Sequence, residues 1–124
     1  MRTGANVVSL TLPFPISQNR IWRRSGNRIH ISKEYAEWKA EADAAFLQQR
    51  KKCGTPIDGH FTYHFVFDEN ERKNRRDGDN LQKCVLDWCQ RAGLIKDDKF
   101  ADGGSWSWGP VQGCFVRLYK VAVA

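Results

Sequence analysis

The sequence predicts an α+β fold in which a mixed β-sheet of about four strands is covered by two helices. Its length of 124 residues fits a single domain, residues 1–124, with enough chain to bury a hydrophobic core. Residues 59–67 alternate between apolar and polar side chains, which is the period of a strand. Residues 33–51 carry apolar side chains at the helical period. The expected order of elements is β-α-β-α-β-β.

The N-terminal half contributes one strand and one helix to this prediction. The strand is expected over residues 6–13, where apolar and polar residues alternate until Pro13 ends the pattern. Residues 14–31 are interpreted as an irregular segment that is rich in arginine. Ser32 is the expected N-cap of a helix from residue 33 to about residue 51. The apolar face of this helix consists of Tyr35, Trp38, Ala42, Ala45 and Phe46.

The C-terminal half adds three strands and a second helix. Four aromatic residues share one face of the strand at residues 59–67. Asp79 is expected to cap the second helix, which ends at Gly93. Residues 100–108 and 114–123 are two further strand candidates. The glycines and the proline between them predict that these two strands form a hairpin.

The chain is basic, with 20 lysines and arginines against 14 aspartates and glutamates and a formal net charge of +6. This excess favours a polyanionic partner such as nucleic acid, although charge alone does not distinguish DNA, RNA and an anionic membrane surface. No apolar stretch is long enough to cross a bilayer, and the N-terminus lacks the apolar segment of a signal peptide. We therefore expect a cytoplasmic protein with no membrane partner and with reduced cysteines.

Residues 75–83 form the most informative segment, because they place two carboxylates two positions apart in a basic chain. Close carboxylates repel one another unless a cation lies between them. If the chain brings Asp98 back beside Asp77 and Asp79, the three side chains are candidate ligands for one or two Mg²⁺ ions. Such ions activate water for attack on a phosphodiester. Lys83 is a candidate to neutralise charge on the phosphate or to orient the water.

The spacing of these residues also allows a purely structural interpretation. Asp79 is explained as a helix cap, and Lys83 with Asp87 is an ordinary ion pair on a helix surface. The pair at residues 97–98 is then a turn. Both interpretations stay open on the spacing alone.

Two basic groups are candidates for contact with DNA phosphates. Arg75 and Arg76 directly precede the acidic residues and are placed to hold neighbouring phosphates. The second group lies in the arginine-rich segment, where Trp22 adds a stacking surface. A solvated basic surface is the alternative for this segment. The candidate contacts of the second group are Asn19, Arg20, Arg23 and Arg24.

Residues 75–83, together with Asp87, residues 92–93 and residues 97–98, closely resemble the signature of the RusA family. This family comprises Holliday junction resolvases, small homodimeric Mg²⁺-dependent endonucleases of bacteria and prophages. Residues 12–20 resemble the family's first strand and the loop that follows it. The resemblance covers nearly the whole chain, and the combined pattern is far more specific than two aspartates alone.

The resemblance implies that Asp77, Asp79 and Asp98 are the catalytic metal ligands, that Lys83 is an essential basic residue and that Arg76 contacts DNA. It implies a homodimer with Mg²⁺ that resolves four-way DNA junctions by paired symmetric nicks, in recombination and repair. A bacterial or phage-encoded cytoplasmic enzyme is expected. A non-catalytic basic module that binds branched DNA is the main alternative, and a nuclease for flaps or single strands is a third.

Two features depart from the family pattern. Gly78 stands where the resemblance leads us to expect a larger apolar residue. Residues 103–108, which include Trp106 and Trp108, match no family feature. The two tryptophans share one face of their expected strand, so we expect them in the core or in a dimer interface rather than in a base-stacking platform.

Overall fold

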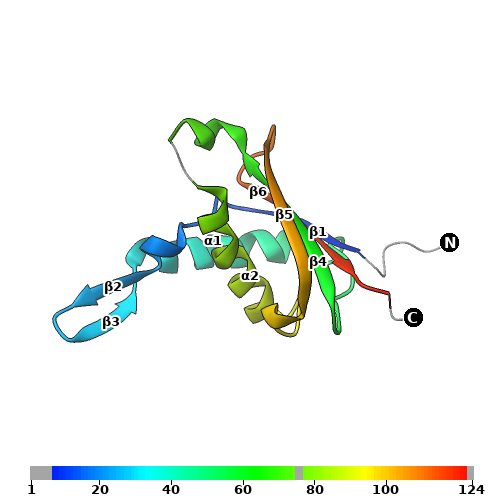
Figure 1. Ribbon diagram of the computed structural model, residues 1–124, viewed down its shortest axis with the longest axis horizontal. Helices are drawn as coiled ribbons and strands as arrows, with labels where there is room; N and C mark the ends of the chain where they lie inside the picture. Colours follow the sequence, from blue (N-terminus) through cyan, green and yellow to red (C-terminus); the bar gives the residue numbers. More distant parts are fainter. Residues whose placement is uncertain (1–6, 75–76, 123–124) are drawn as a thin grey trace.

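The structure, a computed structural model, describes residues 7–74 and 77–122 and confirms the α+β class, with a mixed four-stranded sheet and two α-helices. The strand order is β1-β6-β4-β5, in which β4 and β5 are parallel and the other neighbours are antiparallel. Both helices pack on one face of the sheet (Figure 1). The elements are β1 (Val7–Leu12), α1 (Lys33–Gln49), β4 (Phe61–Asp68), α2 (Gln82–Arg91), β5 (Ala101–Gly109) and β6 (Cys114–Lys120).

The aromatic strand β4 occupies an interior position of the sheet, as its composition requires. Phe65 and Phe67 are fully buried, and β4 is hydrogen-bonded along both edges. Phe65 lies opposite Val116 of β6 on one side and opposite Trp106 of β5 on the other. Side chains opposite one another in a sheet point to the same face, so this row continues the core across three strands.

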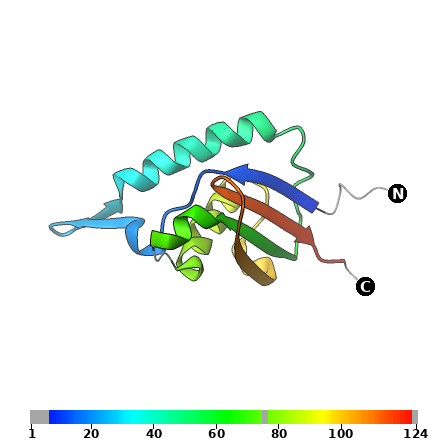
Figure 2. The ribbon, with the colours of Figure 1, turned by 90° about the horizontal axis from the view of Figure 1, so that it is seen from above.

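Helix α1 runs alongside β1 (Figure 2) and begins where the sequence predicts. The Ser32 hydroxyl accepts a hydrogen bond from the Tyr35 amide at 3.1 Å, which confirms it as the N-cap. Helix α2 packs against α1 through Trp88, whose ring meets Phe46 edge-on at 5.5 Å. The Trp88 indole N–H donates to Asp43 of α1 at 2.9 Å, so the two helices form one layer over the sheet.

The interpretation of residues 14–31 as irregular is wrong. This segment forms a short 3₁₀ helix, η2 (Gln18–Arg20), and a separate antiparallel hairpin of β2 (Trp22–Ser25) and β3 (Arg28–Ile31). A two-residue turn joins the strands, and Gly26 in that turn adopts a φ of +64°, which glycine reaches without steric cost. The hairpin projects from the body of the molecule (Figure 1).

The expected hairpin between the last two strands is also wrong. Strand β6 does not pair with β5 but lies between β1 and β4, so the chain crosses the end of β4 between these strands. The crossing loop is anchored by a hydrogen bond from the Asp68 amide to the Gly113 carbonyl at 2.9 Å. Gly113 adopts a φ of +70°, and a Cβ there would overlap the Leu12 carbonyl. The glycine therefore permits the close approach that inserts β6 between its neighbours.

The start of the second helix differs from the prediction by one short turn. The cap is Asp77 rather than Asp79, and it opens a 3₁₀ helix, η4 (Gly78–Leu81), that leads directly into α2. Asp77 has the extended backbone of a cap residue, with φ of −92° and ψ of 115°, whereas Asp79 lies inside the first turn. Two more 3₁₀ helices, η3 (Glu69–Asn74) and η5 (Asp98–Phe100), complete the fold.

The remaining structural expectations concern the cysteines and the membrane. Within the described residues, no helix is long and apolar enough to cross a bilayer. The cysteines are free, as expected, and all of them are buried in the core. Burial raises the pKa of the Cys89 thiol to about 12. The cysteines are Cys53, Cys84, Cys89 and Cys114.

Candidate active site

Asp77 and Asp79 are held on one turn at the start of η4. The Asp77 Oδ1 atom accepts a hydrogen bond from the Asp79 amide at 3.0 Å, which closes the turn and fixes the spacing of the two residues. Both residues are exposed, so their carboxylates remain accessible to solvent and to a large substrate. The prediction that both carboxylates lie at the start of the second helix is confirmed. The N-cap is Asp77, however, and Asp79 lies in the first turn.

The Asp79 carboxylate is bound by two side chains that the sequence reasoning did not assign to the site. The Trp106 indole N–H donates to Asp79 Oδ1 at 2.8 Å, and the Gln82 amide donates to the same oxygen at 3.4 Å. The Tyr63 hydroxyl in turn donates to Gln82 Oε1 at 2.7 Å. Burial, followed by the charge of Asp79, raises the pKa of Tyr63, which keeps this hydroxyl protonated as a donor.

Lys83 connects the helix start to Asp98. Its ammonium lies 3.0 Å from Asp87 Oδ1, one helical turn further along, and 3.3 Å from Asp98 Oδ2. The hydrogen bond to Asp87 is the main reason that the pKa of Lys83 is raised, and the bond to Asp98 adds to it. A second contact, from the Asp98 amide to Gln90 Oε1 at 3.2 Å, ties η5 to α2. The chain therefore returns Asp98 to the helix that carries Lys83.

The three aspartates are nevertheless not gathered into one metal cage. In the part of the chain that the structure describes, no group of three or more histidine, cysteine, aspartate or glutamate side chains is close enough to hold a metal ion. The donor chemistry fits Mg²⁺, because all three candidates are carboxylates. Neither donor to Asp79 uses its Oδ2 atom, and Asp98 is engaged with the Lys83 ammonium. A cation would have to compete with Lys83 for Asp98.

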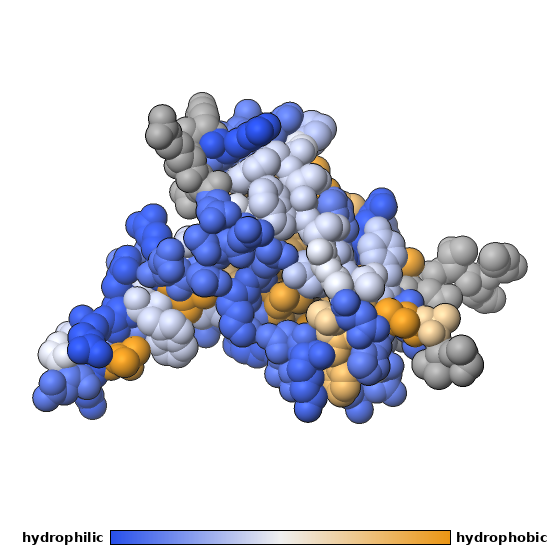
Figure 3. All heavy atoms as spheres, in the orientation of Figure 1, coloured by the Kyte–Doolittle hydropathy of each residue, from blue (hydrophilic) through white to orange (hydrophobic). Residues whose placement is uncertain are grey.

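The candidate DNA contacts of the arginine-rich segment lie in and beside the projecting hairpin. Arg20 Nε and an Arg23 guanidinium nitrogen both bind one oxygen of Glu34, at 3.2 and 3.0 Å. Arg24 and Asn19 are exposed, and the Asn19 amide donates to the Ser17 hydroxyl. Figure 3 shows that the hairpin is hydrophilic apart from a small apolar spot, in agreement with the 64% exposure of Ile29.

Arg75 and Arg76, the two remaining candidate DNA contacts, lie outside the described residues. Trp106 and Trp108 are half-buried and pack against the edge of the core next to Phe67, on one strand face as expected. The expectation missed the second function of the Trp106 ring, which is its contact with Asp79. The sequence signal that could have found it was the pair of departures at Gly78 and residues 103–108, which the sequence analysis did not connect.

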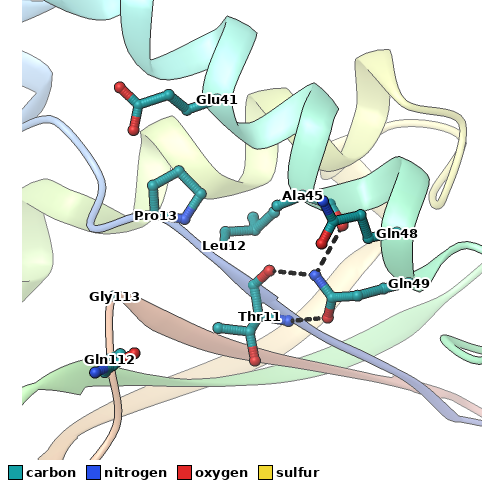
Figure 4. Close-up of a pocket in the computed structure, with 9 residues that line it drawn as sticks. All are labelled: Thr11, Leu12, Pro13, Glu41, Ala45, Gln48, Gln49, Gln112 and Gly113. Carbon is teal, nitrogen blue, oxygen red and sulfur yellow. Dashed lines mark hydrogen bonds between the residues drawn. The ribbon is translucent and has the colours of Figure 1, made fainter.

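A groove lies between α1 and β1, and Glu41 is among the residues that line it (Figure 4). Gln49 bridges it by accepting a hydrogen bond from the Thr11 amide and donating one to the Thr11 carbonyl, both at 2.7 Å. None of the candidate metal ligands lines this groove. Asp77 and Asp79 instead lie on an exposed surface, which suits a macromolecular substrate better than a small molecule.

Comparisons with known proteins identify the family. The model of the family described as endodeoxyribonuclease RusA matches residues 13–108. A crossover junction endodeoxyribonuclease RusA of Shigella sonnei (strain Ss046) is 33% identical over 95 residues, which cover 75% of each chain. Proteins of the same name from Escherichia coli (strain K12) and Enterobacteria phage 82 are each 32% identical, again over 75% of both chains. This chain therefore belongs to the RusA endodeoxyribonuclease family.

Proposed function

We propose that this protein is a Mg²⁺-dependent, structure-selective endodeoxyribonuclease that resolves four-way DNA junctions in recombination and repair. Membership of the RusA family and the names of the similar proteins support this substrate class. The observation that carries the proposal is the pairing of Asp77 and Asp79 on one exposed turn, with Lys83 and Asp98 joined beside it. Acidic ligands on a basic protein are the arrangement that metal-assisted cleavage of a polyanion requires.

Asp77, Asp79 and Asp98 are the proposed ligands of the metal ion. When bound, Mg²⁺ supplies a Lewis acid that polarises the scissile phosphate and lowers the pKa of an attacking water. Asp79 offers its Oδ2 atom while Oδ1 stays bound to Trp106 and Gln82. Asp98 would hold the metal ion in place of its present contact with Lys83, and the bond from its amide to Gln90 fixes its backbone.

Lys83 is the proposed electrostatic partner of the scissile phosphate. Its pKa is raised by Asp87 and Asp98, so it carries a full positive charge at neutral pH. With Asp98 engaged by a metal ion, the Asp87 carboxylate would still hold the Lys83 ammonium. From there Lys83 stabilises the negative charge that develops on the phosphate, a role in which a preorganised cation is far more effective than water.

The hairpin is the proposed contact for a DNA arm outside the cleavage site. It projects from the body of the molecule (Figure 1). Arg23 and Arg24 lie on its strand β2, and Asn19 and Arg20 lie in η2 just before it. Arg20 and Arg23 share Glu34 in exposed ion pairs, which contribute little and are readily exchanged for phosphate. Arg75 and Arg76 are proposed to hold phosphates next to the cleaved bond, because they directly precede Asp77.

A homodimer is part of the proposal, because a four-way junction offers two equivalent strands for cleavage. Two identical subunits related by a two-fold axis present two identical sites to such a substrate. The expected products are paired symmetric nicks that ligase can seal. Sedimentation of the protein under junction-binding conditions tests this part, and a monomer there would contradict the paired mechanism.

A second candidate function is a basic module that binds branched DNA without cutting it. The observation that favours it is the contact of Asp98 with Lys83, together with the lack of a three-carboxylate group among the described residues. A junction, a flap and a single strand should be compared as substrates, each with Mg²⁺ and with EDTA. Cleavage confined to the junction and abolished by EDTA supports the resolvase. Binding without cleavage in any divalent ion supports the module, and preference for the flap or single strand supports a different nuclease.

A further inference from the structure

Near Asp79, the rings of Trp106 and Tyr63 each lie directly against a glycine, and any larger residue at either glycine would collide with the ring. A Cβ atom on Gly78 would lie 2.6 Å from the Trp106 ring, which is closer than side-chain atoms pack. A Cβ atom on Gly104 would overlap the Tyr63 ring. The backbone at both glycines therefore lies directly under an aromatic ring.

These rings bring hydrogen-bond donors to one oxygen of Asp79. Trp106 donates directly at 2.8 Å, and the Tyr63 hydroxyl orients Gln82, whose amide donates at 3.4 Å. Hydrogen bonds to an ionised carboxylate are shorter and stronger than those between neutral groups. Trp106 is rigid, because its ring packs against Phe67 at 6.1 Å and Trp108 at 5.9 Å. Asp79 is thus held through Oδ1, and neither donor occupies Oδ2.

We propose that Trp106 is a positioning residue that presents Asp79 for metal binding, and that Gly78 is required in this chain to admit the Trp106 ring. This inference rests on the proposed metal-dependent cleavage. It explains Gly78 and Trp106, which both depart from the family pattern, by one contact between them. Trp106 touches neither the metal ion nor the phosphate, but it holds the Asp79 side chain through Oδ1 and leaves Oδ2 to the metal ion.

The direct test replaces Trp106 by phenylalanine, which keeps an aromatic ring but is smaller than tryptophan and lacks the indole donor. Trp108→Phe is the matched control, because Trp108 lies on the same strand face and its ring packs on Phe14 and Phe67. The Mg²⁺ concentration that gives half-maximal nicking of a synthetic four-way junction is measured for each protein. Loss of a group that orients a ligand weakens metal affinity roughly tenfold to a hundredfold. We expect that shift for Trp106→Phe, a smaller change in the rate at saturating Mg²⁺, and the wild-type midpoint for Trp108→Phe.

The indole N–H signals of ¹⁵N-labelled protein give a second readout that does not need activity. The chain contains five tryptophans, so the signal lost in Trp106→Phe identifies Trp106. That signal should shift in Asp79→Asn, and it should shift during a titration of the wild type with Mg²⁺. The Trp108 signal, assigned in the same way, should respond more weakly to both changes.

Gly78→Ala tests the other half of the feature. The added methyl group must displace the Trp106 ring, so this variant should weaken Mg²⁺ binding in the wild-type background. In the Trp106→Phe background the smaller ring leaves room, and the donor is already absent. The two substitutions should therefore be non-additive, with the double variant close to Trp106→Phe alone.

A Mg²⁺ midpoint for Trp106→Phe equal to that of the wild type would overturn the inference while leaving the proposed cleavage intact. A wild type that binds the junction and never nicks it would instead remove the proposed function. In that event the indole signals still decide the inference. If the Trp106 signal shifts neither in Asp79→Asn nor on addition of Mg²⁺, the inference is contradicted. If it shifts with Mg²⁺, and Gly78→Ala raises the Mg²⁺ concentration at the midpoint of that shift, the inference is supported.

Discussion

Lys83→Gln should separate the stability of this protein from its activity. The substitution removes two ion pairs, at 3.0 Å to Asp87 and 3.3 Å to Asp98, and leaves a side chain of similar length. The Lys83 side chain is 51% exposed, so solvent screens both pairs. An exposed pair one turn apart on a helix contributes about 0.3–0.5 kcal/mol, and a second exposed pair about 0.2–1 kcal/mol. We therefore expect the free energy of unfolding to fall by about 0.5–1.5 kcal/mol.

The same substitution should reduce junction nicking by a much larger factor. Removing one preorganised group that stabilises transition-state charge lowers kcat by roughly a hundredfold to a thousandfold. Urea unfolding followed by tryptophan fluorescence measures the stability, and single-turnover nicking at saturating Mg²⁺ measures the rate. Arg91→Gln is the matched control, because it also removes one exposed cation of α2, paired with Asp43 at 3.2 Å. The control should lose similar stability and retain nicking.

Two results would exclude this role of Lys83. Nicking by Lys83→Gln at the rate of Arg91→Gln would show that Lys83 is a surface cation of α2 and no part of the site. A loss of about 3 kcal/mol or more in unfolding free energy would show that the ion pairs are structural, because exposed pairs do not reach that size.

Three further predictions concern the cap of α1, the exposed arginine Arg24 and the pH dependence of the Lys83 ion pairs. Ser32→Ala removes the cap of α1 and should cost about 1 kcal/mol of stability by thermal unfolding, with unchanged nicking; unaltered stability would contradict the capping role. Arg24→Ala should weaken binding to junctions of any sequence. It should also lower the slope of log binding constant against log salt concentration by about one; an unchanged slope would exclude Arg24 as a phosphate contact. The raised pKa of Lys83 means that its stabilising pairs are fully present below the ordinary lysine pKa of 10.5 and are lost only as pH rises further. The stability difference between wild type and Lys83→Gln should therefore be constant near neutral pH and vanish in strong alkali, and a difference that vanished near neutrality would contradict this.

The main elements of the fold were predictable because their side chains are sorted by burial. Helix α1 and strand β4 each bury one face, so their sequences carry the helical and strand periods. The hairpin at residues 22–31 was missed because its strands are almost entirely exposed, and no burial pattern marks them. Its Gly-Asn turn at residues 26–27 was the available signal. The placement of β6 between β1 and β4 depends on pairing between distant segments, which local patterns do not encode.

Part of the candidate site was likewise predictable from local sequence, and part depends on contacts between distant segments. Asp77, Asp79 and Lys83 lie within one short segment, so their shared position at a helix start follows from spacing. The contact of Asp98 with Lys83 depends on how the chain leaves α2, and the sequence leaves that path open. Trp106 reaches Asp79 only because β5 pairs in parallel with β4. The glycine at position 78 signalled this contact, but its partner became identifiable only in three dimensions.

The most direct test of the central claim is a nicking assay on a synthetic four-way junction with Mg²⁺, in which wild type and Asp79→Asn are compared at equal junction occupancy. Asp79→Asn keeps the size of the side chain and an oxygen acceptor while it removes the charge that binds the metal ion. We expect paired symmetric nicks by the wild type and bound but uncut junctions with Asp79→Asn. Equal cutting by both proteins, or no cutting by the wild type with any divalent ion, would contradict it.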